Sequence, residues 1–392
     1  MRQVTFLDSA EQLDFIIKNC LKTQIILSPK ALSRFGKSNI EDINSIARKA
    51  KENSIPVFLE WDILMTEQEF PVAVKALREI ELELFDAIRV QDPGAYEYVI
   101  EELTIPIHLN LETGNHNLVG IKNWINLGQG RVERIILSIE LPQKTLAEYC
   151  KQLDVEVEYL ALGRILLFYT PRKLVSPAFI DHDDNKELPS FNSDFIEVLG
   201  SSEESPHKGF PIIENQHGSF MFHIKDQFLF SHLEDLAGTG VEHLRVDLRW
   251  NDNFNTIEMT SKLLEKMDSE LLSQLVKDYP ADTTRGYFHV NKTDVLFKKL
   301  KNQKLVRKDE KFIGHVLDAK KSSYVAILLT GQRTINVGDE ILFVTPLGKE
   351  IATKVHELRN SLKQSVESAS KGNLIFLNYT RGVTQKSALY FK

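Results

Sequence analysis

Short apolar runs alternate with helix-length segments through the first 280 residues, and this alternation limits the folds open to the chain. Amphipathic stretches such as 39–53 and 67–85 are typical of helices. The runs that we predict as strands are 24–28, 56–62, 87–92, 105–112, 134–140, 155–162, 210–213 and 243–249. Eight strands separated by helices in about 250 residues favour a closed (β/α)8 barrel. The competing open sheet lacks its usual dinucleotide motif, because no Gly-x-Gly-x-x-Gly follows the first run.

The pattern changes after residue 280, where short runs rich in branched and aromatic residues alternate with turns. Such a pattern is typical of a small antiparallel barrel or sandwich. We therefore predict a barrel domain at 1–280, a basic connector at 281–310 and a small C-terminal antiparallel β-barrel domain at 311–392. A long insertion at about 164–208 interrupts the first domain. Its acidic tract at 181–187 fits either a lid or a solvated loop.

Composition narrows the class of protein. No apolar run reaches the roughly 18–20 residues that span a membrane, and the N-terminus lacks a secretory signal pattern. We therefore expect a cytoplasmic protein with no membrane partner. A net charge of −7 disfavours general nucleic-acid coating. The segment 298–311 nevertheless carries seven lysines and arginines, so it is either a solvated connector or an RNA contact.

Polar residues alternate with apolar ones along four of the predicted strands, near the carboxyl end of each strand. Because successive side chains of a strand point to opposite faces, one face of each strand is apolar and the other is polar. The helices of a barrel cover the apolar face, so the polar face is expected to point into the lumen. The polar residues are Glu60 and Asp62, then His108, Asn110 and Glu112, then Ser138 and Glu140, and finally Arg245, Asp247 and Arg249.

Filling a barrel with these groups is energetically unfavourable, because a buried charge costs several kcal/mol unless it is paired. Five acids exceed what Arg245 and Arg249 can neutralise, which favours a charged ligand chamber. The alternative is an internal salt-bridge network without a ligand. The candidate catalytic residues are Glu60, Asp62, Glu140 and Asp247, and the candidate ligand-binding residues in the strands are His108, Asn110, Glu112, Arg245 and Arg249.

Metal and nucleophilic chemistry are not indicated by local motifs. The histidines considered as ligands lack the spacing of a metal site, so no metal is expected. They are His108, His116, His217 and His223. Neither Cys20 nor Cys150 ends a predicted strand, and no Gly-x-Ser-x-Gly elbow is present.

Several segments, in order along the chain, resemble landmarks of the collagenase-like peptidase family U-32. They are 90–95, 136–141, 163–176, 217–219, 225–226, 245–249 and 284–288. Segments 313–318 and 337–349 look like the small C-terminal β-barrel of that family. Each motif alone is weak, and their order carries the resemblance.

The family's cysteine signature is only partly kept. Glu158, Gly163, Ile165, Val175 and Ser176 match it, whereas Leu160, Arg164 and Pro171 depart from it, and Leu166 and Lys173 stand at its two cysteine positions. Relatives in RNA-base or quinone hydroxylation are understood to hold an iron–sulfur cluster through cysteines of this region. The resemblance therefore predicts that this chain lacks the cluster, and no cofactor is expected.

Three functional hypotheses follow, and they leave open whether the chain is an enzyme. The first is a factor in tRNA or rRNA base hydroxylation that binds a small carboxylate through Arg245 and Arg249. The second is a collagenase-like peptidase that uses carboxylates and water. The third is a non-catalytic partner of a cysteine-bearing paralogue. We favour a cluster-free RNA-modification factor that binds a ligand or partner, with Arg164 or Lys173 supplying positive charge in place of the cluster.

Overall fold

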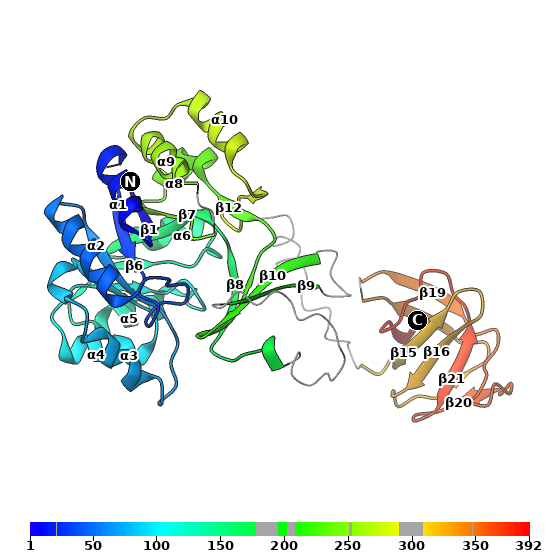
Figure 1. Ribbon diagram of the computed structural model, residues 1–392. Helices are drawn as coiled ribbons and strands as arrows, with labels where there is room; N and C mark the ends of the chain where they lie inside the picture. Colours follow the sequence, from blue (N-terminus) through cyan, green and yellow to red (C-terminus); the bar gives the residue numbers. More distant parts are fainter. Residues whose placement is uncertain (21, 178–194, 202–207, 251–252, 290–308, 347) are drawn as a thin grey trace, which may run out of the picture. The chain divides into compact units, whose positions relative to one another are not determined.

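The computed structural model describes residues 1–20, 22–177, 195–201, 208–250, 253–289, 309–346 and 348–392 (Figure 1). Two compact units, Met1–Val290 and Asn291–Lys392, make up the chain. None of the helices in the described ranges is long and apolar enough to cross a membrane.

Eight parallel strands of the first unit form a closed ring, because β13 pairs with β7 on one side and with β1 on the other. In ring order the strands are β1 (Arg2–Leu7), β2 (Gln24–Leu27), β3 (Val57–Trp61), β4 (Ala87–Val90), β5 (Ile107–Asn110), β6 (Val132–Ile136), β7 (Glu156–Gly163) and β13 (His243–Asp247). The predicted (β/α)8 barrel is therefore confirmed.

Helices connect the strands and surround the ring. They are α1 (Ala10–Asn19), α2 (Ile40–Glu52), α3 (Phe70–Leu77), α4 (Pro93–Glu102), α5 (Leu118–Leu127), α6 (Gln143–Cys150), α8 (Leu233–Ala237), α9 (Asn255–Glu265) and α10 (Ser269–Asp278), with short 3-10 turns η1 (Leu82–Leu84) and η2 (Phe230–His232). Polar side chains cap several of them. Ser9, Asn39, Asp92 and Asn117 each accept a backbone N–H in the first turn of the following helix.

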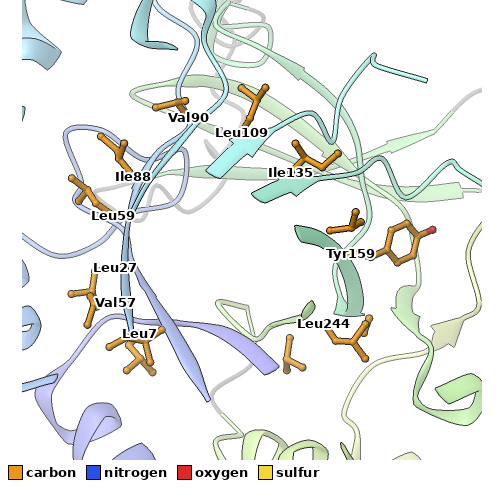
Figure 2. Close-up of a cluster of buried hydrophobic side chains, with 14 of the residues drawn as sticks. Leu7, Leu27, Val57, Leu59, Ile88, Val90, Leu109, Ile135, Tyr159 and Leu244 are labelled. Carbon is orange, nitrogen blue, oxygen red and sulfur yellow. The ribbon is translucent and has the colours of Figure 1, made fainter. Parts of the chain in front are cut away.

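The main hydrophobic core lies between the ring and its helices. Figure 2 shows apolar side chains of the strands, including Leu59, Leu109, Ile135 and Leu244, pointing away from the centre of the ring. The intervening side chains, such as Glu60, are buried on the opposite side of each strand. The prediction that apolar faces meet the helices is confirmed for these strands. The inward faces are mixed, because they carry charged residues such as Glu60 and also an apolar cluster of Val4, Phe6, Ile26, Phe58 and Ala87.

Two of the strand predictions were wrong. The ring begins with Arg2–Leu7, which was not predicted, because Gln3 and Thr5, on the same outward face as Leu7, break the apolar run. Both bond to neighbouring backbone instead: Gln3 donates to Ile257 O and Thr5 to Val246 O. Residues 210–213 lie in β10 (Lys208–Asn215), which belongs to a separate sheet and not to the barrel.

That separate sheet is formed by the insertion after β7. Its antiparallel strands are β8 (Leu166–Thr170), β9 (Ile196–Ser201), β10 and β11 (Gly218–Phe222), in the order β8-β11-β10-β9. The insertion therefore extends past residue 208. The insertion covers the loop after β2, where the ring centres of Phe220 and Phe35 lie 4.6 Å apart. The acidic tract 181–187 lies outside the described residues.

The first unit extends ten residues beyond the predicted boundary at 280. After the insertion, β12 (Asp226–Phe228) pairs with β7, and β14 (Thr283–Thr284) pairs in turn with β12. Phe288 is also buried in the core of the barrel unit. Most of the predicted connector, residues 290–308, lies outside the described residues.

The second unit is antiparallel. Its six-stranded sheet has the order β19-β18-β22-β15-β16-β21 and is accompanied by the pair β17–β20. The strands are β15 (Phe312–Lys320), β16 (Tyr324–Leu329), β17 (Ile335–Asn336), β18 (Glu340–Val344), β19 (Glu350–Lys354), β20 (Ser368–Ala369), β21 (Leu374–Asn378) and β22 (Ala388–Phe391). They enclose a core of their own around Phe343 and Leu389.

A substitution of Gly163, at the end of β7, tests how closely β7 and β13 approach each other where the ring closes. Its φ is +140°, and an added Cβ would lie 2.6 Å from the backbone oxygen of Asp247 on β13. We predict that Gly163→Ala lowers the free energy of unfolding by about 2–6 kcal/mol, from backbone strain plus overlap. Urea unfolding measures this change.

The matched control is Gly130→Ala, because Gly130 has a φ of +81° and no atom within 4 Å of the added Cβ. That variant should lose only about 1–2 kcal/mol, the penalty of the left-handed conformation. Equal losses in the two variants would contradict the tight approach of β7 and β13.

Candidate functional site

A buried ion pair lies at the centre of the barrel lumen. Glu158 on β7 is fully buried and accepts two hydrogen bonds from Arg89 on β4, at 2.7 Å from Nη1 and 2.9 Å from Nη2. Such bidentate pairing is the geometry in which a guanidinium best neutralises a carboxylate. Burial alone would raise the pKa of Glu158, but Arg89 outweighs it and holds that pKa well below its usual range.

Further side chains extend this pair across the lumen. Arg89 Nε donates to Glu60 Oε2 on β3 at 2.7 Å, so one guanidinium serves two carboxylates. Arg245 on β13 bonds to Glu112 through Nη2 and approaches Glu158 through Nη1 at 3.4 Å. The lumen is therefore held together by charge pairs that join β3, β4, β7 and β13 with the loop after β5.

Glu60 differs electrostatically from its neighbours. Burial raises the pKa of Glu60 to about 7, and the like charge of Asp62 adds to this shift. Arg89 opposes the shift without cancelling it, because Arg89 also neutralises Glu158. The pKa of Asp62 is lowered despite its burial, because Arg34 and Arg249 stabilise the charge. Glu60 is thus the carboxyl group of this network that can hold a proton near neutral pH.

Two more carboxylates lie nearer the carboxyl ends of the strands. Asp62 accepts the backbone N–H of Arg34 at 2.8 Å and its Nε at 2.6 Å. Asp247 accepts Arg249 Nε at 2.9 Å and Nη2 at 2.6 Å. Arg249 also lies 3.6 Å from the centre of the Phe6 ring. Both carboxylates are therefore already engaged by arginines.

Above this layer lies a small cavity of about 20 Å³, enough for one water molecule. Its walls come from the barrel and from the insertion. The lining residues are Phe6, Arg34, Phe35, Glu60, Glu112, Arg164, Leu166, Phe222, Arg245, Asp247, Arg249 and Trp250.

Four arginines that line this cavity have a buried nitrogen without a hydrogen-bond partner among the described residues. The atoms are Arg34 Nη1, Arg164 Nη1, Arg245 Nε and Arg249 Nη1. Arg164 Nη1 makes only a loose ion pair, 3.8 Å from Glu197. Leaving a buried donor unpaired is costly, and the residues that carry all four donors line one cavity, which makes this part of the barrel a candidate anion or water site.

A larger cleft of about 650 Å³ lies beside the cavity and shares Phe35, Arg249 and Trp250 with it. Its cationic side chains include Lys173, on the insertion, and Lys37. Leu166 and Lys173, which stand at the two cysteine positions of the resembled family, therefore line the cavity and the cleft respectively. The departure from the family pattern falls at the mouth of the barrel.

The structure brings together most of the residues expected from the sequence. Glu60, Asp62, Glu112, Arg245, Asp247 and Arg249 lie in one charged network, and Arg164 lies above it. His108 and Asn110 are buried in β5. His108 packs 4.4 Å from Phe58, and burial, followed by repulsion from Arg134, lowers its pKa well below the usual value.

Glu140 is the exception. Its side chain is 49% exposed and pairs with His116 at 3.2 Å, outside the network. The strand β6 ends at Ile136, and Leu141 N donates to Ser138 O in a turn, so the alternation of side chains no longer applies at residue 140. The expectation that Glu140 points into the lumen was wrong.

Three arginines and a glutamate of the network were missed as candidates. Arg89 stands between Ile88 and Val90, and Glu158 between Val157 and Tyr159, so strict alternation could have found both. Arg134 on β6 also lies in the lumen, 3.7 Å from Glu158, but the charged Glu133 beside it breaks the alternation. Arg34 comes from the loop after β2, where no periodic signal exists. These additional arginines weaken the earlier argument for a ligand chamber, which compared five acidic residues with Arg245 and Arg249 alone.

The cysteines do not fit a cluster at the mouth. Cys20 ends α1 and Cys150 ends α6, and burial raises their thiol pKa values to about 11 and 12. A cluster ligand must be a thiolate, which these environments disfavour. The family's cysteine positions hold Leu166 and Lys173, which cannot serve as thiolate ligands.

Comparison with known proteins identifies relatives over most of the chain. The model of peptidase family U32 matches residues 9–296. The tRNA hydroxylation protein P of Haemophilus influenzae is 21% identical over 359 residues, which covers 78% of this chain and 77% of that protein. The tRNA hydroxylation protein P of Escherichia coli is 22% identical over 319 residues, covering 69% of each chain. The solved U32 peptidase Mk0906 is 14% identical, with a TM-score of 0.35, over 42% of this chain and 70% of its own.

The central pair yields a stability prediction. Glu158→Gln leaves Arg89 and Arg245 buried without their shared carboxylate, so the free energy of unfolding should fall by about 3–5 kcal/mol. Glu133→Gln, on the exposed face of β6, should change it by less than about 0.5 kcal/mol. Urea unfolding of both variants checks this; a loss below 1 kcal/mol at Glu158 would contradict a structural role for the pair.

The raised pKa of Glu60 yields a pH prediction. Between pH 4.5, its usual value, and about 7, the folded protein keeps a proton that the unfolded chain has released. Glu60 therefore stabilises the fold below pH 4.5 and loses this contribution as the pH rises to about 7. The free energy of unfolding of Glu60→Gln, relative to wild type, should rise between pH 5 and 7 in urea titrations. A pH-independent difference would show that Glu60 titrates normally.

Proposed function

Because the chain belongs to peptidase family U32, and relatives along most of its length are tRNA hydroxylation proteins, we propose that it acts in RNA-base hydroxylation. In this proposal the chain binds a small carboxylate at the barrel mouth and has no cysteine-ligated cluster of its own. A cysteine-bearing paralogue is the proposed partner for the redox step.

One observation supports a ligand at this site: four arginines, each with an unpaired nitrogen, line a single cavity. A carboxylate has two oxygens that together accept up to four hydrogen bonds, and guanidinium donors bind it in preference to neutral acceptors. A cavity lined by unpaired cationic donors therefore suits a carboxylate better than an apolar ligand. Arg245 and Arg249, proposed from the sequence as anchors, would each contribute one nitrogen rather than a bidentate pair.

The neighbouring cleft provides room for the rest of the ligand. The cavity holds about one water, so we propose that the carboxylate displaces this water while the remaining atoms lie in the cleft. Lys173 adds positive charge there, and Trp250 and Phe35 offer aromatic surface. RNA would be contacted elsewhere, and the segment 298–311 remains the proposed contact.

Arg164 allows the carboxylate site to be tested in cells with little damage to the fold. Its side chain is 25% exposed and comes from the insertion. In a deletion strain, mass spectrometry of tRNA and rRNA nucleosides should show loss of a hydroxylated pyrimidine, which wild type restores. Arg164→Gln should restore less than about a tenth of it, a loss typical of removing a charged contact worth roughly 1.5–3 kcal/mol.

Arg172→Gln is the matched control, because Arg172 is an exposed arginine that follows β8 and lines neither the cavity nor the cleft. It should restore the nucleoside fully. Unchanged hydroxylated uridines and cytidines in the deletion strain would refute the role in RNA modification. Full restoration by Arg164→Gln would refute the carboxylate site alone.

A further inference from the structure

Two histidines and an aspartate converge on the outside of the barrel, away from the cavity. Among the described residues, His232, Asp235 and His289 form a group whose potential ligand atoms lie within 4.8 Å of one another. His232 ends η2 and Asp235 lies in α8, whereas His289 follows β14 near the end of the first unit. Their 57-residue separation explains why spacing along the sequence did not reveal them.

The distances between these atoms match the edges of a tetrahedron around a metal. His289 Nε2 lies 3.2 Å from His232 Nδ1 and 3.5 Å from Asp235 Oδ2, and His232 Nδ1 lies 3.6 Å from the same oxygen. Zinc–ligand bonds of about 2.0–2.2 Å give tetrahedral edges of roughly 3.3–3.6 Å. The three distances are therefore close to those that one zinc ion requires, with the two histidine nitrogens slightly nearer each other.

The surroundings fix these ligands in place. Gln143 Nε2 donates to Asp235 Oδ1 at 3.3 Å, which leaves Oδ2 directed toward the histidines. The backbone N–H of Gln143 donates to Phe288 O at 2.8 Å, and because Phe288 directly precedes His289, this bond keeps Gln143 close to His289. Outer contacts of this kind orient metal ligands.

We propose that His232, Asp235 and His289 bind one zinc-type divalent cation, with the fourth position open to water. Two imidazoles and one carboxylate suit zinc, whereas magnesium and calcium prefer oxygen ligands alone. The side chains are 25–45% exposed, so an ion can enter from solvent. The site is independent of the proposed carboxylate and RNA functions. Bound metal would fasten the segment around His289 to α8.

The competing explanation is a set of hydrogen bonds among the same three side chains without any ion. Titration of the full chain with Zn²⁺ in competition with a chromophoric chelator distinguishes the two. The proposal predicts one Zn²⁺ per chain, and it predicts that Co²⁺ bound in its place gives the intense visible absorption of a tetrahedral site. Absence of stoichiometric binding, or the weak spectrum of six-coordinate Co²⁺, would overturn it.

Substitutions at the proposed ligands test whether the ion binds at these residues. Asp235→Asn keeps the side-chain shape and His289→Gln removes one imidazole; each should weaken Zn²⁺ binding by more than about 100-fold. Gln143→Ala should weaken it by about 10- to 100-fold, as expected for an outer contact. His356→Gln, an exposed histidine of the second unit, is the matched control and should leave the affinity unchanged. Unaltered affinity in Asp235→Asn and His289→Gln would place the ion elsewhere and refute the proposal.

Discussion

The carboxylate of Glu158 and the guanidinium of Arg89 are both fully buried in the barrel lumen, and neither can remain there without the other. Arg89 also holds Glu60, and Glu158 also attracts Arg245, so the two residues together join four strands of the ring. Most barrels fill this space with branched apolar residues. Here the outer face of the ring is apolar (Figure 2), whereas the lumen combines these charge pairs with a small apolar cluster of Val4, Phe6, Ile26, Phe58 and Ala87.

This arrangement links the fold to the candidate site. The paired charges near the centre satisfy one another, whereas the arginines nearer the insertion keep donors that no described residue accepts. Arg164 reaches the cavity from the insertion and lies 4.8 Å from the centre of the Trp250 ring, and Leu166 lines the same space. The insertion thus closes the barrel at the place where the sequence departs from the family's cysteine pattern.

Much of this could be predicted from side-chain alternation. Val57 and Leu59 oppose Glu60 within one strand, and the structure keeps that opposition wherever the strand stays regular. The rule fails at Glu140, because β6 ends four residues earlier. It cannot find Arg34, which a loop supplies, or the contact between His232 and His289, which depends on where distant segments pack. Local periodicity predicts faces of strands, and tertiary packing alone decides which loops complete a site.

The central claim is that the unpaired arginine nitrogens donate hydrogen bonds to a bound carboxylate. Formate is small enough to test the cavity without filling the cleft, and thermal unfolding can compare it with chloride at equal ionic strength. A ligand that binds only the folded state stabilises it by RT ln(1 + c/Kd), where c is the ligand concentration, so the stabilisation grows with the logarithm of c above Kd. We expect formate to raise the melting temperature of wild type above that in chloride, increasingly with concentration, and Arg164→Gln to lose most of this rise. Identical curves in formate and chloride would contradict the claim.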